Sequence, residues 1–315
     1  MAAVRISVVI PAFDAWATLP GVLDALEPQV DRVDREAILV ESGAGGRAGE
    51  MARGRPWLQV VSLADRTLPG RSRNIGVSRA HGGVLAFLDA DAVPRRNWLD
   101  LLERSLDDSG GGVVAVAGAI LNANPWNPIA VAGHLLEFSD WLPGRRPGLT
   151  HGASCNLLVT RAALEQAGGF PEDVFPGEDT ILSFRLAATG RLLFAPDATV
   201  RHFTRTGPLE FLRHQQRLGA AYVVVCRSVA FPHRAMARPL LAPLAVPFRL
   251  AALGRRLARH PQEAVTAVVV LPLLVAGLVA WAWGVARPGR AGPRDRVGGR
   301  RSRVARWRIR GTSPS

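Results

Sequence analysis

Hydrophobic residues are grouped in short continuous runs over the first part of the chain. Four runs are clear: Ile6–Ile10, Ala37–Val40, Leu58–Leu63 and Val84–Leu88. Runs of this length are typical of strands buried on both faces of a parallel sheet. Between the first two, apolar residues recur at helical spacing at Leu19, Val22, Leu23 and Leu26, with Thr18 placed as the N-cap. Strands alternating with helices predict an α/β fold with an open, mainly parallel sheet.

The pattern is less regular after residue 110. It predicts a strand over Val113–Ala119, a helix over 128–142, an extended segment over 153–160, a helix over 178–188 and a long helix over 208–230. No internal repeat is visible in this region. We therefore expect residues 1–230 to form one domain with helices on both sides of the sheet.

The C-terminal part has a different character. Residues 264–286 contain no charged side chain, and Trp281 and Trp283 lie near one end. At about 1.5 Å per residue, such a helix crosses a hydrocarbon core of about 30 Å, which predicts a transmembrane helix. Residues 231–263 alternate apolar and arginine patches and predict an amphipathic region at the membrane interface. Residues 287–315 are predicted to be a basic, disordered tail.

The orientation of this segment is left open by the charges. A single span would carry the arginine-rich tail across the bilayer, against the tendency of basic residues to stay inside. Three arrangements remain open. The span crosses despite its tail, residues 239–252 form a partial second span, or the segment bends at Pro272 and leaves on the side where it entered. We expect firm membrane attachment with the main domain facing the cytoplasm, and residues 236–260 at the interface.

Composition refines this picture. The formal net charge is +13, but residues 1–230 contain 23 arginines against 24 acidic residues, so the excess lies beside the apolar segment. This layout favours an anionic membrane surface over nucleic acid, and no nucleic-acid partner is expected. Cys155 and Cys226 are far apart and predict neither a disulfide framework nor a cysteine zinc site. The N-terminus lacks the regions of a signal peptide, which favours a cytoplasmic main domain.

The clearest chemical signal is the pair Asp89 and Asp91, directly after the run Val84–Leu88. In an extended segment, positions i and i+2 face the same way, so both carboxylates can converge on one ligand. The carboxyl end of a strand is where open α/β sheets bind ligands. Two hard oxygen donors beside a diphosphate suit Mg²⁺ or Mn²⁺.

Several blocks together resemble family 2 glycosyltransferases. They are Val8-Val9-Ile10-Pro11-Ala12-Phe13-Asp14, Arg73-Asn74-Ile75-Gly76, Ala86-Phe87-Leu88-Asp89-Ala90-Asp91, Gly168-Gly169-Phe170 with Gly177-Glu178-Asp179, and Val200 and His202 with Arg205-Thr206. They cover roughly residues 4–230 in the order expected for the family. The resemblance implies a GT-A fold, in which a mixed, mainly parallel sheet carries a nucleotide half and an acceptor half.

The resemblance also implies roles for individual residues. Donor contacts are expected from Pro11, Phe13, Asp14, Glu41, Arg73, Asn74 and Asp89. Metal ligands are expected at Asp91 and Asp89, with His202 as a possible third ligand or diphosphate contact. Asp179 matches the general base of an inverting transfer, and Asn156 and Glu178 belong to the acceptor side. We expect transfer of a sugar from a UDP- or GDP-sugar to a hydroxyl of a glycan or lipid-linked acceptor, in building cell-envelope polysaccharide.

Departures from the family pattern keep other functions open. Glu41-Ser42 replaces the usual acidic pair, and Asp14 stands where an amide is common, so the choice of nucleotide is less defined than the transfer. The QxxRW sequence of processive synthases is absent, with Gln215-Gln216-Arg217-Leu218 as the nearest match. One alternative is a sugar nucleotidyltransferase, although Pro11-Ala12-Phe13-Asp14 is not a glycine-rich phosphate loop. The other is a degenerate member acting as a membrane scaffold.

Overall fold

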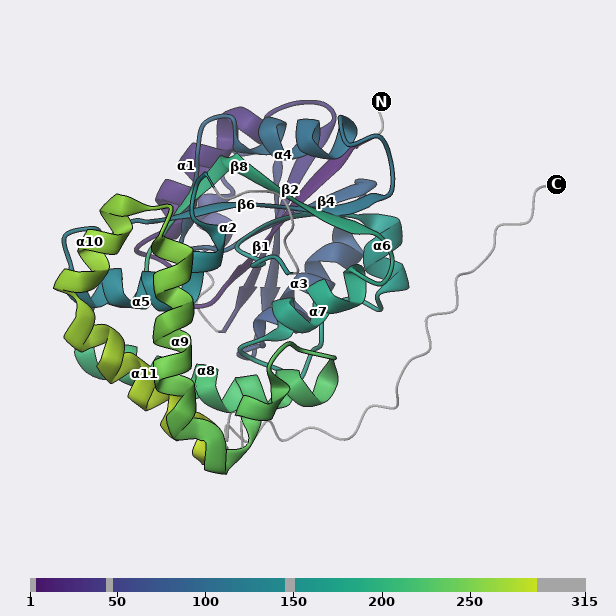
Figure 1. The fold of residues 1–315 in the computed structure, drawn as a ribbon. Helices are drawn as coiled ribbons and strands as arrows, with labels where there is room; N and C mark the ends of the chain where they lie inside the picture. The colour runs from purple at the N-terminus through teal and green to yellow at the C-terminus, as the bar shows by residue number, and fades with distance from the viewer. Residues whose placement is uncertain (1–3, 44–47, 145–150, 288–315) are drawn as a thin grey trace.

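A computed structural model of the chain describes residues 4–43, 48–144 and 151–287. One eight-stranded sheet forms the centre of the molecule (Figure 1), with the strand order β3-β2-β1-β4-β7-β6-β8-β5. The strands are β1 (Ile6–Ala12), β2 (Arg35–Ser42), β3 (Leu58–Leu63), β4 (Val84–Leu88), β5 (Ala92–Pro94), β6 (Val113–Asn122), β7 (Asn156–Thr160) and β8 (Arg191–His202). The four apolar runs at the start of the chain are β1 to β4, as predicted.

Helices cover the sheet and continue beyond it. The helices of the first part are α1 (Leu19–Val30), α2 (Ala48–Met51), α3 (Pro69–Arg79), α4 (Trp98–Asp107), α5 (Pro128–Phe138), α6 (Arg161–Gln166) and α7 (Glu178–Leu186). The later helices are α8 (Pro208–Ser228), α9 (Ala242–Leu257), α10 (Pro261–Val269) and α11 (Leu271–Ala286). Three short 3₁₀ turns, η1 (Ser139–Trp141), η2 (Arg234–Ala237) and η3 (Pro239–Leu241), complete the described elements.

The sheet is mixed but mainly parallel, as predicted. Strand β1 pairs in parallel with β2 and β4, and β2 pairs in parallel with β3. Strand β7 is inserted antiparallel between β4 and β6. Because β1, β2 and β4 run the same way, their carboxyl ends meet at one edge, where the predicted donor and metal residues follow them.

Helix α3 packs very closely on this parallel part of the sheet. A Cβ at Gly76 would lie 2.4 Å from Cγ1 of Val9 in β1, so only glycine fits there. The strands beneath are completely buried, including Val8, Val9 and Ile10. Close packing of α3 fixes the position of Arg73, one turn earlier on the same helix.

Thr18 stands at the N-cap position of α1, but it makes no side-chain capping bond. Its hydroxyl donates instead to the carbonyl of Ala90, at 2.8 Å. The predicted capping interaction is therefore wrong. Thr18 connects the start of α1 to the turn that carries Asp89 and Asp91, and helps to hold that turn in place.

The apolar segment 264–286 does not form one straight helix. It is divided between α10 and α11, which bend by 79° at Val270, next to Pro272. Within the described residues, no single helix is long and apolar enough to span a membrane, and this bent pair is the one candidate. The helix breaks where Pro272 removes a backbone donor, which agrees with the bend at Pro272 left open by the sequence. The prediction that 264–286 enters a membrane stays a prediction. Apart from Arg287, the predicted tail 287–315 lies outside the described residues.

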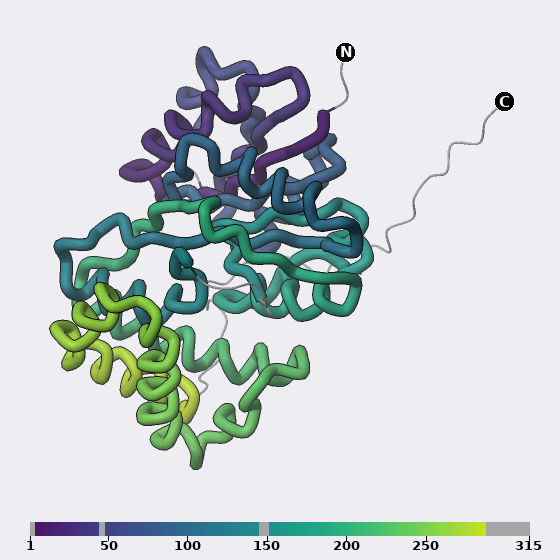
Figure 2. The backbone as a smooth tube through the Cα atoms, turned by 45° about the horizontal axis from the view of Figure 1, so that its top comes forward, coloured from purple at the N-terminus to yellow at the C-terminus, as the bar shows by residue number. Residues whose placement is uncertain are grey.

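Helix α11 packs against α8 with the two backbones in contact. A Cβ at Gly219 would lie 1.9 Å from the carbonyl oxygen of Trp281, and one at Gly284 would lie 2.0 Å from that of Gln216. Figures 1 and 2 show α8 to α11 gathered at one end of the molecule, beside α5. The inner face of α11, including Leu274, is buried by this packing. Gly219 of α8 and Gly284 of α11 thus allow the two helices to pack with their backbones in contact.

Helix α9 also has a buried face, formed by Ala242, Ala245, Leu253 and Leu257. The neighbouring Leu240 and Leu244 are 93% and 57% exposed. This division agrees with an amphipathic segment over 236–260, although half of it packs on the protein. Its predicted place at a membrane interface stays a prediction.

Replacing Gly219 by valine is expected to destabilise the protein by at least about 1–3 kcal/mol, because the added side chain would overlap the backbone of α11. The measurement is the thermal midpoint of the purified chain in neutral detergent. Gly254→Ala is the matched control, since Gly254 lies in α9 and a Cβ there meets nothing within 4 Å. An unchanged midpoint in Gly219→Val would contradict the close packing of α8 and α11.

Candidate functional site

A cavity of about 800 Å³ lies where the carboxyl ends of β1, β2 and β4 face helices α5, α7, α8 and α9. Its lining includes Asp89, Asp91, Asp179 and His202, which come from three separate parts of the chain: the turn after β4, the start of α7 and the end of β8. The fold therefore brings the metal, base and donor candidates to one place.

At the β1 end, the cavity offers a flat, partly exposed ring. Phe13 is 46% exposed, and the guanidinium carbon of Arg66 lies 4.4 Å from its ring centroid. Pro11 and Ser42 line the same region. An aromatic face beside a cation is suited to a planar, anionic ligand such as a nucleotide.

Two of the predicted donor residues do not line the cavity. The Glu41 side chain is buried, and its Oε2 accepts a hydrogen bond from Ser62 Oγ at 3.3 Å. Asp14 is exposed and adopts a left-handed conformation with φ of 50°. Ser42 and Arg66 lie in the cavity instead. The side chains of Glu41 and Asp14 are therefore not positioned for the predicted donor contacts.

Arg73 occupies the centre of the site and is only 2% exposed. Its Nη2 donates to Asp89 Oδ1 at 2.6 Å, and its Nη1 donates to Glu178 Oε1 at 2.8 Å. The charges of Asp89 and Glu178 raise the pKa of Arg73 above its usual value, against the effect of its burial. Arg73 thus joins the donor-side and acceptor-side carboxylates through its two Nη atoms, while its buried Nε has no hydrogen-bond partner within the described residues.

Helix α7 brings Glu178 and Asp179 into the cavity. Gly177 precedes it with φ of 105°, which glycine adopts without strain. Asp179 accepts hydrogen bonds from the backbone nitrogens of Thr180 and Ser154, at 2.7 and 3.3 Å. Burial and the charge of Asp179 raise the pKa of Glu178 to about 7, although Arg73 opposes this. Asp179 is thus held by backbone donors beside a buried carboxyl group.

Asn74 and Asn156 have structural partners rather than free amide groups. Asn74 donates to the Phe170 carbonyl and accepts from the Phe170 nitrogen, and it does not line the cavity. Asn156 is fully buried, accepts from Trp98 Nε1 at 2.7 Å, and donates to two backbone carbonyls. Both amides are thus engaged by protein groups, Asn74 by Phe170 and Asn156 by the core, and their predicted donor and acceptor contacts stay predictions.

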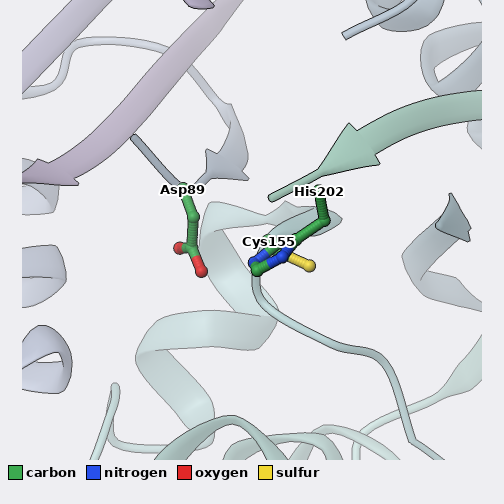
Figure 3. Close-up of side chains that lie close together, drawn as sticks. All are labelled: Asp89, Cys155 and His202. Carbon is green, nitrogen blue, oxygen red and sulfur yellow. The ribbon is translucent and has the colours of Figure 1, made fainter. Parts of the chain in front are cut away.

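At the end of β8, His202 Nε2 lies 3.3 Å from Asp91 Oδ1. His202 Nδ1 is buried without a hydrogen-bond partner. One ligand atom from each of Asp89, Cys155 and His202 lies within 4.8 Å of the others. Figure 3 shows these three side chains arriving from different segments: the turn after β4, the loop before β7 and the end of β8.

Cys155 is the residue of this group that the sequence analysis did not assign to the site. Its thiol is buried, and burial together with the charges of Asp89 and Asp91 raises its pKa well above its usual value. Burial and the charge of Asp89 also raise the pKa of Asp91, which His202 opposes. A bound cation would relieve the repulsion between these acidic groups, so the donor set fits a divalent metal.

Known proteins resemble this chain in both sequence and fold. The model of the family described as glycosyl transferase family 2 matches residues 7–165. A pre-mycofactocin glycosyltransferase of Mycobacterium tuberculosis is 28% identical over 221 residues, which are 68% of this chain. The match spans 39% of that relative's length. Glycosyltransferase AglE of Haloferax volcanii is 27% identical over 231 residues, 70% of this chain and 73% of that protein.

Among solved structures, the mannosyltransferase PcManGT from Pyrobaculum calidifontis, in complex with GDP-Man and Mn²⁺, has a TM-score of 0.60. The match covers 90% of this chain and 87% of that one, at 21% identity. TarS 1–349 of S. aureus has a TM-score of 0.51 at 16% identity, covering 87% and 81% of the two chains. These structures share the GT-A fold seen here. Since the family model also matches about half of the sequence, the chain belongs to glycosyl transferase family 2.

Proposed function

We propose that the chain is an inverting, metal-dependent glycosyltransferase that moves a sugar from a nucleotide-diphosphate donor to an acceptor hydroxyl. The observation that carries this proposal is the meeting of Asp89, Asp91, His202 and Asp179 in one cavity. A metal site and a separate carboxylate beside a nucleotide-sized cavity are what such a transfer needs. The relative AglE and the mannosyltransferase in complex with GDP-Man support the same class of reaction.

The nucleotide is proposed to bind at the β1 end, with its base on Phe13 and its phosphates directed towards Asp91. Arg66 supplies positive charge at this end, since its guanidinium lies against Phe13. Arg73 acts indirectly, because its ion pair with Asp89 keeps that carboxylate oriented. A UDP- or GDP-sugar is the expected donor.

Mg²⁺ or Mn²⁺ is proposed to bind to Asp91, Asp89 and His202, with Cys155 beside them. One ligand atom of Asp89 lies within 4.8 Å of one of His202, and Asp91 Oδ1 lies 3.3 Å from His202 Nε2, so these groups are close enough to hold one ion together. A bound ion would neutralise the charge that develops on the leaving diphosphate. The ring of His202 is held by its contact with Asp91 and by packing against Phe138, with the ring centroids 4.9 Å apart.

Asp179 is proposed to be the general base. Its carboxylate is held by the backbone nitrogens of Ser154 and Thr180, which fix it at the cavity wall. It takes the proton of the acceptor hydroxyl as that oxygen attacks the anomeric carbon from the face opposite the diphosphate. Attack from that face inverts the anomeric centre. Glu178 is tied to Arg73 and serves to position the neighbouring groups.

The acceptor is proposed to be a glycan or a lipid-linked glycan, used in building cell-envelope polysaccharide at the cytoplasmic face of the membrane. One similar protein is an N-acetylglucosaminyl-diphospho-decaprenol L-rhamnosyltransferase of Mycobacterium tuberculosis, 34% identical over 171 residues. The bent pair α10 and α11 is the candidate for attachment. Release of nucleotide diphosphate from a nucleotide sugar with Mn²⁺ distinguishes this function from a scaffold or a nucleotidyltransferase.

Asp91→Asn is expected to abolish turnover, because it removes a charge from the proposed metal site, and to remove the Mn²⁺-dependent part of the thermal stabilisation by nucleotide. Thermal shift with and without Mn²⁺ measures the binding, and diphosphate release measures turnover. Asp197→Asn is the control, since Asp197 is exposed on β8 outside the cavity. Full activity of the wild-type chain in excess chelator would contradict the metal site.

Asp179→Asn is expected to lower kcat by about two to four orders of magnitude while donor affinity is nearly kept, because the amide cannot accept the proton. Steady-state kinetics and donor titration separate the two effects, and NMR of the product linkage tests inversion. Asp173→Asn provides an exposed control two residues before the start of the cavity wall. A variant that loses donor binding but keeps a normal kcat would assign Asp179 to the donor instead.

A further inference from the structure

The cavity continues beyond the carboxylates into a region walled by α5, α8, α9 and α11, which we call the helical lobe. The reaction described above uses none of the side chains of these helices. The lobe is lined by Leu135, Leu136, Leu218, Phe248, Leu253 and Leu278, among others. It is therefore an apolar extension of the candidate active site, with room for part of a second substrate.

A series of aromatic side chains connects the two regions. Ring centroids of consecutive members lie between 4.9 and 6.5 Å apart in the series Phe138, Trp141, His151, Phe231, Tyr222 and Trp281. Phe138 itself lies 4.9 Å from His202, in the proposed metal site. All of these rings line the cavity, so an aromatic wall leads from the metal site to Trp281. Such walls bind the apolar faces of sugars as well as hydrocarbon.

Arg249 stands at the far end of this wall. Its guanidinium carbon lies 4.4 Å from the centroid of Trp281, and its Nε is inaccessible to solvent without a hydrogen-bond partner. Burial and the charge of Arg256 lower the pKa of Arg249 to about 10. A cation placed in an apolar wall beside another cation is unfavourable unless an anion joins it.

The carboxylates of the lobe do not supply that anion. Glu137 lies 3.1 Å from His214 Nε2 and 4.0 Å from Arg205. Asp140 lies 3.0 Å from Nε of Arg256. Within residues 4–43, 48–144 and 151–287, no carboxylate lies within ion-pair distance of Arg249. Asp140 attracts Arg249 from beyond ion-pair distance, but its own ion pair is with Arg256, so Arg249 has no ion-pair partner within these residues.

The outer side of the same helices is apolar. The exposed side chains of α10 and α11 include Val265, Val268, Val275 and Val279, which are between 37% and 71% exposed. In Figure 2, these yellow-green helices lie at the lower left edge of the molecule. An apolar chain that leaves the lobe on this side would meet hydrophobic protein surface rather than water.

We propose that the helical lobe binds the phosphate of a lipid-linked acceptor, with Arg249 as the phosphate-binding residue. The sugar next to the phosphate lies along the aromatic wall, and the lipid chain leaves towards α10 and α11. This assignment rests on the proposed function, because it names the acceptor of the same transfer. An arginine suits the task since its planar fork binds phosphate through two parallel hydrogen bonds.

The test uses the full chain in neutral detergent and three probes: farnesyl phosphate, farnesol and inorganic phosphate. Isothermal titration is expected to show farnesyl phosphate binding at least about tenfold tighter than either other probe. Arg249→Gln is expected to weaken farnesyl phosphate about ten- to hundredfold, since a hydrogen bond to a charged group is lost. Arg255→Gln is the matched control, because it removes the same charge from an exposed position of α9.

Each alternative result overturns part of the assignment. Equal binding of farnesol excludes a phosphate site, and equal binding of inorganic phosphate excludes a lipid site. Unchanged affinity in Arg249→Gln, or no binding of farnesyl phosphate by the wild-type chain, excludes the proposal as a whole. If Arg249→Gln does not fold, Arg249→Lys replaces it, with affinity for farnesyl phosphate reduced several-fold and that for farnesol unchanged.

The donor site is tested separately in the same proteins. Nucleotide sugar with Mn²⁺ is expected to stabilise Arg249→Gln as much as the wild-type chain, because Arg249 is not part of the proposed donor site. If the wild-type chain binds farnesyl phosphate but does not bind nucleotide sugar, the result contradicts the proposed function alone. Donor binding without phosphate-lipid binding would contradict the acceptor assignment alone.

Discussion

The organisation of the site depends on the buried guanidinium of Arg73. It holds Asp89 from the turn after β4 and Glu178 from the start of α7, which are far apart in the sequence. Breaking a buried pair by removing one partner costs about 3–5 kcal/mol, because the remaining charge has no water around it. Arg73 can be buried because Gly70 and Gly76 let the backbone of α3 pack closely on either side. Gly70 lies against the carbonyl of Pro171, and Gly76 lies against the side chain of Val9. The donor and acceptor halves are thus fixed to each other by one charged side chain.

Around this pair, the protein concentrates more negative charge than it neutralises. Asp91 lies beside His202, Asp89 has one oxygen on Arg73, and Asp179 is held by backbone nitrogens. The raised pKa of Asp91 reflects this crowding, because burial and Asp89 both disfavour its ionised form. A divalent cation and a diphosphate ligand together relieve the repulsion while adding little net charge. The same electrostatic arrangement therefore favours a metal and an anionic donor in combination.

The local part of this design could be predicted from the sequence. Fully buried parallel strands leave continuous apolar runs, so β1 to β4 and the carboxylates after β4 were predictable. It was not predictable which of two neighbouring side chains faces the cavity, because a shift of one residue turns a side chain to the other face of the sheet. Ser42 lines the cavity and Glu41 does not, and Cys155 does while Asn156 enters the core. For Cys155 and Asn156, that choice depends on the pairing of β7 between β4 and β6, a contact distant in sequence. For Glu41 and Ser42, it depends on the register of β2 with β1 and β3.

The two faces of the apolar segment 264–286 could not be predicted from the sequence for a related reason. Composition alone does not distinguish a helix surrounded by lipid from one with two different faces. The inner face of α11 places Gly284 against α8 and Trp281 in the cavity wall, while Val279 and Trp283 are about half exposed. A helix with this division closes the helical lobe with one side and presents apolar surface with the other. Attachment to a bilayer through that outer side would bring the lobe next to the lipid, so an acceptor carried by a lipid would need to travel only about the thickness of one helix to enter the helical lobe.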